Sequence, residues 1–404
     1  MRPIDYKLFF TTFFLVVFWM IMISSVSVYS SFRVTDLMVK AWLVEEAYNH
    51  FYVLRNLSHV FIAMITLAIV VKIPYSFFEK YSKIFIIISI ILLVTVLLIW
   101  PSWNWARWWI NLPFLPFAIQ PTEFLKFSMI AYLAYFFKRY KNSLHTFSDW
   151  FIPFWIILWV VVLLVWLQPD FWTILVLVPI SVIMFFYAGA NVKYLSILFI
   201  LGIFLSIWVY FWWKYDKQNP ETRNKISYIT DRIDNFLSDE KESIKNKTIN
   251  YQTEQALIAI WSWWFTGLWF WQSIQKFGYL PEVQWDFIFS VVTEELWFIW
   301  VFVLLCIYMY IWYRGFYISS HVSDPFAKYF AVWVSSWILL QAFINIWVNL
   351  NIVPLTWITL PFVSYWGSSL LSLVLWLWVL LNISREVQEK GKYERFWRKR
   401  IFGI

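Results

Sequence analysis

Glycine is scarce in this chain, with only 8 among 404 residues. An average protein contains about 7% glycine, and transmembrane helices usually contain more of it than soluble helices do. Charged residues are scarce as well: they make up 14% of the chain, against about 25% in a typical soluble domain. The one cysteine, Cys306, allows neither an internal disulfide nor a cysteine-based metal site. These deficits exclude an ordinary soluble domain and a disulfide-stabilised one.

Apolar residues fill the chain instead, since 62% of it is hydrophobic. Residues 84–102 and 151–168 contain no charge, and such runs approach or reach the roughly 17–25 residues that a helix needs to cross a bilayer. The runs are continuous rather than alternating, which favours helices over a β-barrel. The sequence therefore predicts an all-α polytopic membrane protein with about ten transmembrane helices, at residues 8–30, 51–71, 84–101, 121–137, 152–167, 172–190, 194–213, 287–312, 329–350 and 364–383.

The distribution of basic residues predicts the orientation. An even number of spans places both termini on one side of the membrane, and the loops and tails on that side carry most of the lysines and arginines. The short loops on the other side carry only Arg33, Lys40, Arg55 and Arg107. By the positive-inside rule, both termini are cytoplasmic. The basic segment 384–404 is then a cytoplasmic tail that anchors to anionic lipids, and no nucleic-acid partner is expected.

The longest polar segment lies between the seventh and eighth spans. Residues 214–286 are expected to form a large extracytoplasmic loop, polar at first and mixed apolar and polar after residue 254. Loops of this length tend to be functional or disordered, and the motifs given below favour function. With no soluble segment expected on either side, residues 1–404 are predicted to form a single membrane domain.

Charged residues inside or beside the spans are the candidates for chemistry, because intramembrane charge is costly and usually functional. Glu123 and Lys126 are three residues apart and share a helix face. They form either an ion pair that holds the bundle together or a site for a diphosphate. Asp170 precedes the sixth span, where capping of that helix is favoured over catalysis. Glu294 and Glu295 fall in the outer half of the eighth span, and at most one of them can readily face a shared cavity.

Asp286 stands directly before the eighth span, at the expected outer surface of the membrane. Desolvation at such a boundary can raise the pKa of a carboxylate, which suits a general base. A simple helix N-cap is the alternative, and position alone favours the cap.

Six segments together resemble the signature motifs of the SEDS family. The strongest is FGYLPEVQWDFIF over 277–289, and the others are QPTEFLK at 120–126, QPDFWT at 168–173, EELWFIW at 294–300, QAFIN at 341–345 and LPFVSYWGSS at 360–369. The resemblance covers nearly the whole chain in the right order. Two features depart from the family pattern: Gln284-Trp285 stands where His-Thr is usual, and Asn351 replaces a usual glycine. Residues 272–276 and 345–349 look more like the division members than the elongation members.

The resemblance implies a peptidoglycan glycosyltransferase that polymerises lipid II, the undecaprenyl-diphosphate disaccharide-peptide, during septal cell-wall synthesis. It implies that Asp286 is the catalytic base. The residues expected to bind substrate are Glu123, Lys126, Arg107, Asp170, Glu295 and Ser368. No cofactor or protein-bound metal is expected to be required, although a divalent cation could assist at the diphosphate.

The resemblance further implies an inner-membrane location, at the division septum. The expected partners are a class B penicillin-binding protein transpeptidase and other membrane proteins of the division machinery. Two other functions stay open. A lipid II flippase fits buried ionisable residues among ten spans, and a non-catalytic division scaffold fits the altered residues 284 and 285.

Tryptophan is as abundant as glycine is scarce, with 32 residues. Interfacial aromatic belts explain tryptophans near span ends, but Trp19, Trp159, Trp208 and Trp376 fall mid-span. Several others occupy glycine positions of the family pattern, namely Trp261, Trp263, Trp264, Trp269, Trp297, Trp300, Trp347, Trp357 and Trp366. We hypothesise that many of these residues are glycines, encoded by UGA in a lineage that reads this codon as glycine.

Overall fold

The computed structural model describes residues 4–70, 72–99, 110, 118–140, 151–168, 170–189, 196, 204, 207, 211, 236, 247–261, 267–296, 298–356 and 358–402. Within these ranges the regular secondary structure is helical, and the only β interaction is an isolated bridge between Ile110 and Ile119. The prediction of an all-α protein is therefore confirmed.

Among the described residues, nine longer helices belong to the bundle: α1 (Tyr6–Val26), α3 (Phe51–Val70), α5 (Ser82–Ile99), α6 (Pro121–Tyr140), α7 (Ile152–Leu167), α8 (Phe171–Tyr187), α13 (Phe298–His321), α14 (Pro325–Asn349) and α15 (Gly367–Phe402). Five of the described helices are long and apolar enough to cross a membrane, namely α1, α3, α13, α14 and the first part of α15, while α5, α7 and α8 are shorter apolar helices. The chain is thus a multi-pass membrane protein.

The predicted spans agree with these helices except in two places. The span predicted at 287–312 is wrong, because it is two helices: α12 (Ile288–Glu295) ends where Leu296 turns to an extended backbone, and α13 begins at Phe298. The span predicted at 194–213 lies almost entirely outside the described residues. The tail predicted at 384–404 continues α15 as a helix to Phe402.

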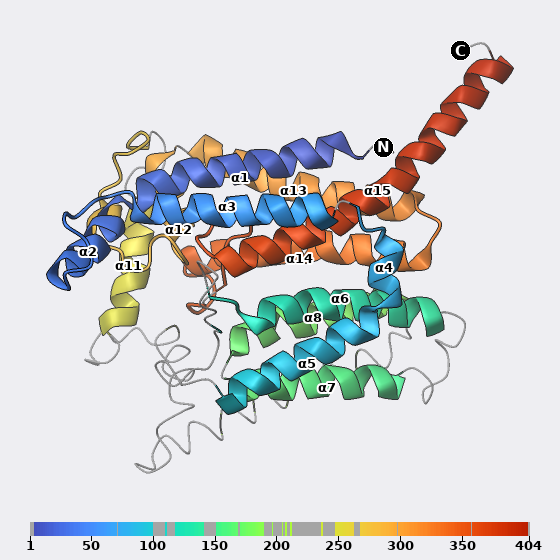
Figure 1. Ribbon diagram of the computed structural model, residues 1–404, viewed down its shortest axis with the longest axis horizontal. Helices are drawn as coiled ribbons and strands as arrows, with labels where there is room; N and C mark the ends of the chain where they lie inside the picture. Colours follow the sequence, from blue (N-terminus) through green and yellow to red (C-terminus); the bar gives the residue numbers. More distant parts are fainter. Residues whose placement is uncertain are drawn as a thin grey trace.

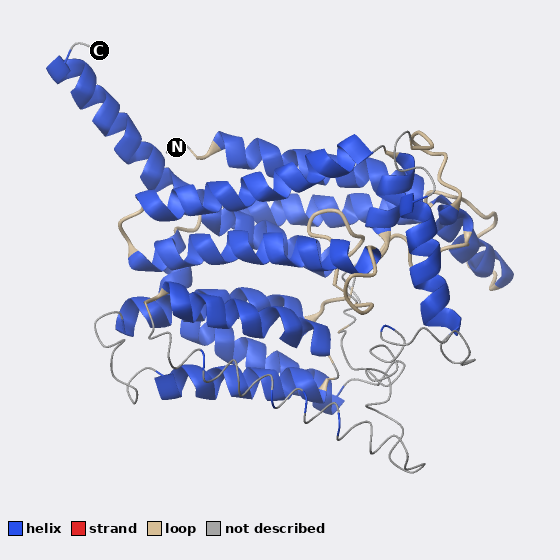
Figure 2. Ribbon diagram, turned by 180° about the vertical axis from the view of Figure 1, so that it is seen from behind, coloured by secondary structure: helices blue, strands red, loops and turns tan. Residues whose placement is uncertain are grey.

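Shorter helices gather mainly at one end of the bundle. Figure 1 shows α2 (Val28–Lys40), α11 (Lys247–Trp261) and α12 at the end opposite the two termini, while α4 (Tyr75–Lys80) lies near the termini. The two termini themselves lie at the same end, as an even number of spans requires. Figure 2 shows that the loops at the α11 end reach in between the helices.

The core of the bundle is built around α14 and α15. In their apolar windows 72% and 89% of residues are buried, so these two helices are enclosed by the others rather than by lipid. Trp337 of α14 and Trp376 of α15 meet edge to face, with ring centroids 5.6 Å apart. Gly315 lets α13 approach α14 closely, because a Cβ at this position would lie 2.2 Å from Ser335 Oγ.

Candidate active site

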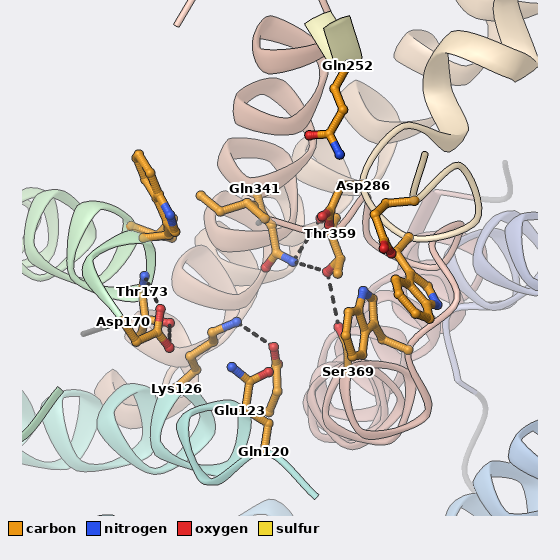
Figure 3. Close-up of a pocket in the computed structure, with 16 residues that line it drawn as sticks. Gln120, Glu123, Lys126, Asp170, Thr173, Gln252, Asp286, Gln341, Thr359 and Ser369 are labelled. Carbon is orange, nitrogen blue, oxygen red and sulfur yellow. Dashed lines mark hydrogen bonds and ion pairs between the residues drawn. The ribbon is translucent and has the colours of Figure 1, made fainter. Parts of the chain in front are cut away.

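A cavity of about 420 Å³ opens among the bundle helices and the segment that carries Asp286 (Figure 3). Six parts of the chain supply its polar lining: the starts of α6 and α8, α11, the segment before α12, α14, and the start of α15 with the segment that leads into it. Its lining residues are Gln120, Glu123, Lys126, Asp170, Trp172, Thr173, Val176, Gln252, Glu282, Trp285, Asp286, Gln341, Ile358, Thr359, Trp366 and Ser369. Four carboxylates and one ammonium group therefore share one enclosed space.

Glu123 and Lys126 form an ion pair on one wall of this cavity. Lys126 Nζ lies 2.7 Å from Glu123 Oε1, and both side chains are about nine-tenths buried. The second carboxylate oxygen accepts a hydrogen bond of 3.0 Å from Ser372 Oγ on α15. Pro121 at the first turn of α6 starts the helix here without losing a hydrogen bond, and it sets the i, i+3 pair facing inward. The ammonium group is thus held in place beside open space.

Asp170 caps α8, as its position in the sequence predicts. Its Oδ1 accepts from Thr173 N at 3.2 Å, and its Oδ2 accepts from Thr173 Oγ at 2.8 Å. Burial raises the pKa of the Asp170 carboxyl, while the bonds from Thr173 and the charge of Lys126 lower it in part. The carboxyl is nevertheless in the cavity wall, so capping and contact with a ligand are compatible.

We expect replacement of Asp170 by Asn to flatten the pH dependence of stability. Because the pKa of Asp170 is raised, the folded state binds the proton more tightly than the unfolded state does. The free energy of unfolding therefore falls as the pH rises from about 3.9, the usual aspartate value, through the raised pKa. Asn can still cap the helix. Because Asn does not titrate, it removes this fall in the free energy of unfolding. Thermal-unfolding midpoints in detergent should diverge in favour of D170N as the pH rises, and parallel curves would contradict this.

Asp286 lies opposite Lys126 across the cavity and is only 6% exposed. Asp286 is not the N-cap of the following helix, because Phe287 occupies that position in α12. Two buried amides of α14 hold its backbone instead: Asn345 Nδ2 and Asn349 Nδ2 donate to the Asp286 carbonyl oxygen at 3.1 and 3.0 Å. Ser290 Oγ donates to Asn349 Oδ1 at 2.7 Å. These bonds fix the segment that carries the carboxylate.

We expect Asn345→Ala to lower the turnover number more than it changes the Michaelis constant, because Asn345 positions Asp286 without lining the cavity. A displacement near 1 Å can cost about 10²-fold in rate. The matched control is Asn382→Ala, which removes another amide that donates to a backbone carbonyl, that of Ile73, on the far side of the bundle. Equal losses in both variants would show that Asn345 acts only through stability.

The segment before Asp286 is tied to α1 and α12 by buried polar contacts and packs against α2. Lys276, in the short 3₁₀ helix η2 (Gln275–Phe277), lies 2.7 Å from Glu295 Oε1 of α12. Ser25 Oγ of α1 donates to the same carboxylate at 2.6 Å. The adjacent Gly278 has φ +96°, and a Cβ there would lie 2.7 Å from the Tyr29 ring of α2. Glycine is therefore required at this turn.

The structure brings most of the residues expected at the site together. Asp286, Glu123, Lys126 and Asp170 all line the cavity. Glu295 does not: it is fully buried against Lys276 and Ser25. This is a consequence of the break after α12, which removes Glu294 and Glu295 from the predicted span. Ser368 is not among the lining residues although Ser369 is, and Arg107 lies outside the described residues.

Sequence reasoning missed Gln252, Thr359 and the role of the α14 amides. A signal for the amides was present, because Gln341, Asn345 and Asn349 are spaced by four residues along a mostly apolar helix and so share one face. Gln341 Nε2 donates to both the carbonyl and the hydroxyl oxygen of Thr359 at 3.0 Å. No comparable pattern marks Thr359.

Together, the apolar helices and the acidic cavity define a polytopic membrane protein with a candidate polar site inside its bundle. The family model described as "Cell cycle protein", whose name joins FtsW, RodA and SpoVE, matches residues 6–389. The chain belongs to this family, which confirms the SEDS resemblance.

Curated relatives agree with the family model over most of the chain. Stage V sporulation protein E of Bacillus subtilis is 33% identical over 83% of this chain and 88% of its own. The probable peptidoglycan glycosyltransferase FtsW of Buchnera aphidicola subsp. Schizaphis graminum is 34% identical over 84% and 92%, and that of Wigglesworthia glossinidia brevipalpis is 30% identical over 98% and 97%.

Solved structures share the fold at lower identity. A chain from a structure titled "Structural coordination of polymerization and crosslinking by a peptidoglycan synthase complex" matches with a TM-score of 0.70 and 21% identity, over 96% of this chain and 99% of that one. The rod shape determining protein RodA of Thermus thermophilus matches with a TM-score of 0.64 and 20% identity, over 95% and 97%. These likenesses establish the fold.

Proposed function

We propose that this protein is a peptidoglycan glycosyltransferase that polymerises lipid II during septal cell-wall synthesis, with Asp286 as the general base. The observation that carries the proposal is the shared cavity, in which a buried carboxylate on a fixed backbone faces a buried ammonium group. The names of the curated relatives support the same activity.

In the proposed reaction, the Asp286 carboxylate takes the proton from the 4-hydroxyl of the acceptor GlcNAc. That oxygen attacks the anomeric carbon of the donor MurNAc, the bond from this carbon to the diphosphate oxygen breaks, and undecaprenyl diphosphate leaves with inversion. One carboxylate suffices because the diphosphate is an activated leaving group, whereas glycoside hydrolysis usually needs two. Lys126 supplies positive charge to the departing diphosphate, and Glu123 orients Lys126 through their ion pair.

We expect Lys126→Met to lower the rate of polymerisation by about 10²–10³-fold, the range seen when one group that stabilises transition-state charge is removed. Met keeps the length of the side chain and removes its charge. Rates with purified protein and labelled lipid II give the measurement. Lys138→Met, on the same helix, is the control, because Lys138 pairs with Glu79 and Asp324 outside the cavity. Equal losses in both variants would remove Lys126 from the mechanism.

The proposal includes a class B penicillin-binding protein as partner, an inner-membrane location at the septum and cytoplasmic termini; other division proteins are further expected partners. It needs no cofactor. A divalent cation would be an additional source of positive charge at the diphosphate, although no three potential ligands among the described residues lie close enough to hold one. Polymerisation in the presence of a chelator tests this part.

Reconstitution in liposomes separates a polymerase from a flippase, which also fits charged groups buried between helices. Purified protein, with the partner transpeptidase, is incorporated together with labelled lipid II. A polymerase yields long glycan chains. A flippase instead exposes lipid II on the opposite leaflet without forming chains, and a scaffold gives neither product; either of these results would overturn the proposal.

A further inference from the structure

The backbone at several tryptophans has a conformation that suits glycine. Among the described residues, six that are not glycine have positive φ, and three of them are tryptophans: Trp42 at 58°, Trp269 at 76° and Trp271 at 73°. Positive φ is a genuine outlier for a bulky side chain and the ordinary use of glycine. Gly267, in the same segment as Trp269 and Trp271, has φ 62°. Tryptophan accounts for 32 of the 404 residues but for three of these six outliers, which is far more than its share of the chain.

Other tryptophans place an unpaired polar atom inside the bundle. The side chains of Trp19 on α1 and of Trp376 and Trp378 on α15 are at most 2% exposed. Their indole Nε1 atoms are buried without a hydrogen-bond partner, whereas a buried tryptophan usually finds one. Small residues at such positions let helix backbones approach closely in a membrane, as Gly315 does between α13 and α14.

Trp42 and Trp269 leave most of their side chains exposed. The Trp42 side chain is 94% exposed and that of Trp269 is 66% exposed. The Trp42 ring therefore buries too little surface to offset a strained backbone. A positive φ and a buried indole nitrogen without a hydrogen-bond partner are independent signs of a misplaced tryptophan. Each sign occurs at several tryptophans in a chain that has 8 glycines.

We propose that at least six of the tryptophans are glycine in the protein that the cell makes: Trp19, Trp42, Trp269, Trp271, Trp376 and Trp378. Their codon is UGA, which the source cell reads as glycine. This inference does not rest on the proposed function. Glycine at 269 and 271 relieves the backbone strain in the segment that leads to Lys276 and Asp286. Glycine at 19, 376 and 378 lets α1 and α15 each pack more closely against their neighbouring helices.

Three tryptophans, Trp172, Trp285 and Trp366, line the cavity of the candidate active site. The rings of Trp285 and Trp366 have centroids 5.5 Å apart. Trp366 stands at a glycine position of the family pattern, and glycine there would leave more space beside Ser369.

The direct test combines the gene sequence with mass spectrometry of peptides from the native protein, isolated from its source cells. We expect UGA codons and glycine masses at the six positions. Trp337 is the internal control, because its Nε1 donates to Gln341 Oε1 at 3.1 Å; it should have a UGG codon and a tryptophan mass. UGG codons or tryptophan masses at the six positions would overturn the proposal, and glycine at Trp337 would overturn the structural criterion.

A second measurement compares two versions made in a host that reads all codons in the standard way. One version has tryptophan at the six positions and the other has glycine, and thermal unfolding is followed in the same detergent. The glycine version should unfold at the higher temperature, whereas W337G alone should unfold at a lower one. A lower midpoint for the glycine version would contradict the inference.

Discussion

Asp286→Ala is expected to abolish the formation of glycan chains from lipid II. A positioned general base contributes about 10²–10⁴-fold to a rate, and no other described carboxylate in the cavity has its backbone held by two side-chain amides as Asp286 has. Asp286→Asn should have nearly the same effect, because it keeps the shape of the side chain and removes the base. The measurement is chain formation by purified protein with its partner transpeptidase, resolved by gel electrophoresis of labelled product.

Asp170→Asn is the matched control for this prediction. It makes the same chemical change in a carboxylate of the same cavity, and it keeps the helix cap. Activity in D170N but not in D286N would assign the base to Asp286. Chains formed by D286A at the parental rate would retain the polymerase and remove Asp286 as its base.

Lys276→Met is expected to destabilise the protein by about 3–5 kcal/mol, because it leaves the carboxylate of Glu295 buried without its counter-charge. The two side chains are 1% and 0% exposed, so solvent cannot replace the lost partner. Replacing both in Lys276→Met/Glu295→Gln should recover most of the loss, since no charge then remains buried. Thermal-unfolding midpoints in a single detergent provide the comparison.

Lys40→Met gives the surface reference for Lys276→Met. Lys40 pairs with Asp36 at 2.7 Å, but the side chains are 69% and 41% exposed, and exposed pairs contribute about 0–1 kcal/mol. If the thermal-unfolding midpoint of K276M is no lower than that of K40M, the buried Lys276–Glu295 pair does not stabilise the segment before Asp286. A double variant as unstable as K276M would show that Lys276 acts through packing rather than charge.

The membrane-spanning pattern is readable from the sequence because it depends on local apolar length. Residues 152–167 were predicted as a span and are the whole of α7, and the span predicted at 51–71 differs from α3 by one residue. The cap at Asp170 is also local, since it needs only the amide of Thr173 three residues on. The pairing of Glu123 with Lys126 follows from one turn of helix.

The interior of the site depends on contacts between residues far apart in the chain. Ser25 and Glu295 are separated by 270 residues, and Asn349 reaches an Asp286 carbonyl 63 residues away. The break after α12 likewise cannot be read from an uninterrupted apolar run, and it moves Glu295 from the expected site into a buried ion pair. The sequence alone determined most of the membrane-spanning helices, the family and four of the residues that line the cavity. Tertiary packing alone decided which polar groups face the cavity and which hold its walls, because burial and hydrogen bonding are properties of surfaces that meet only in the folded bundle.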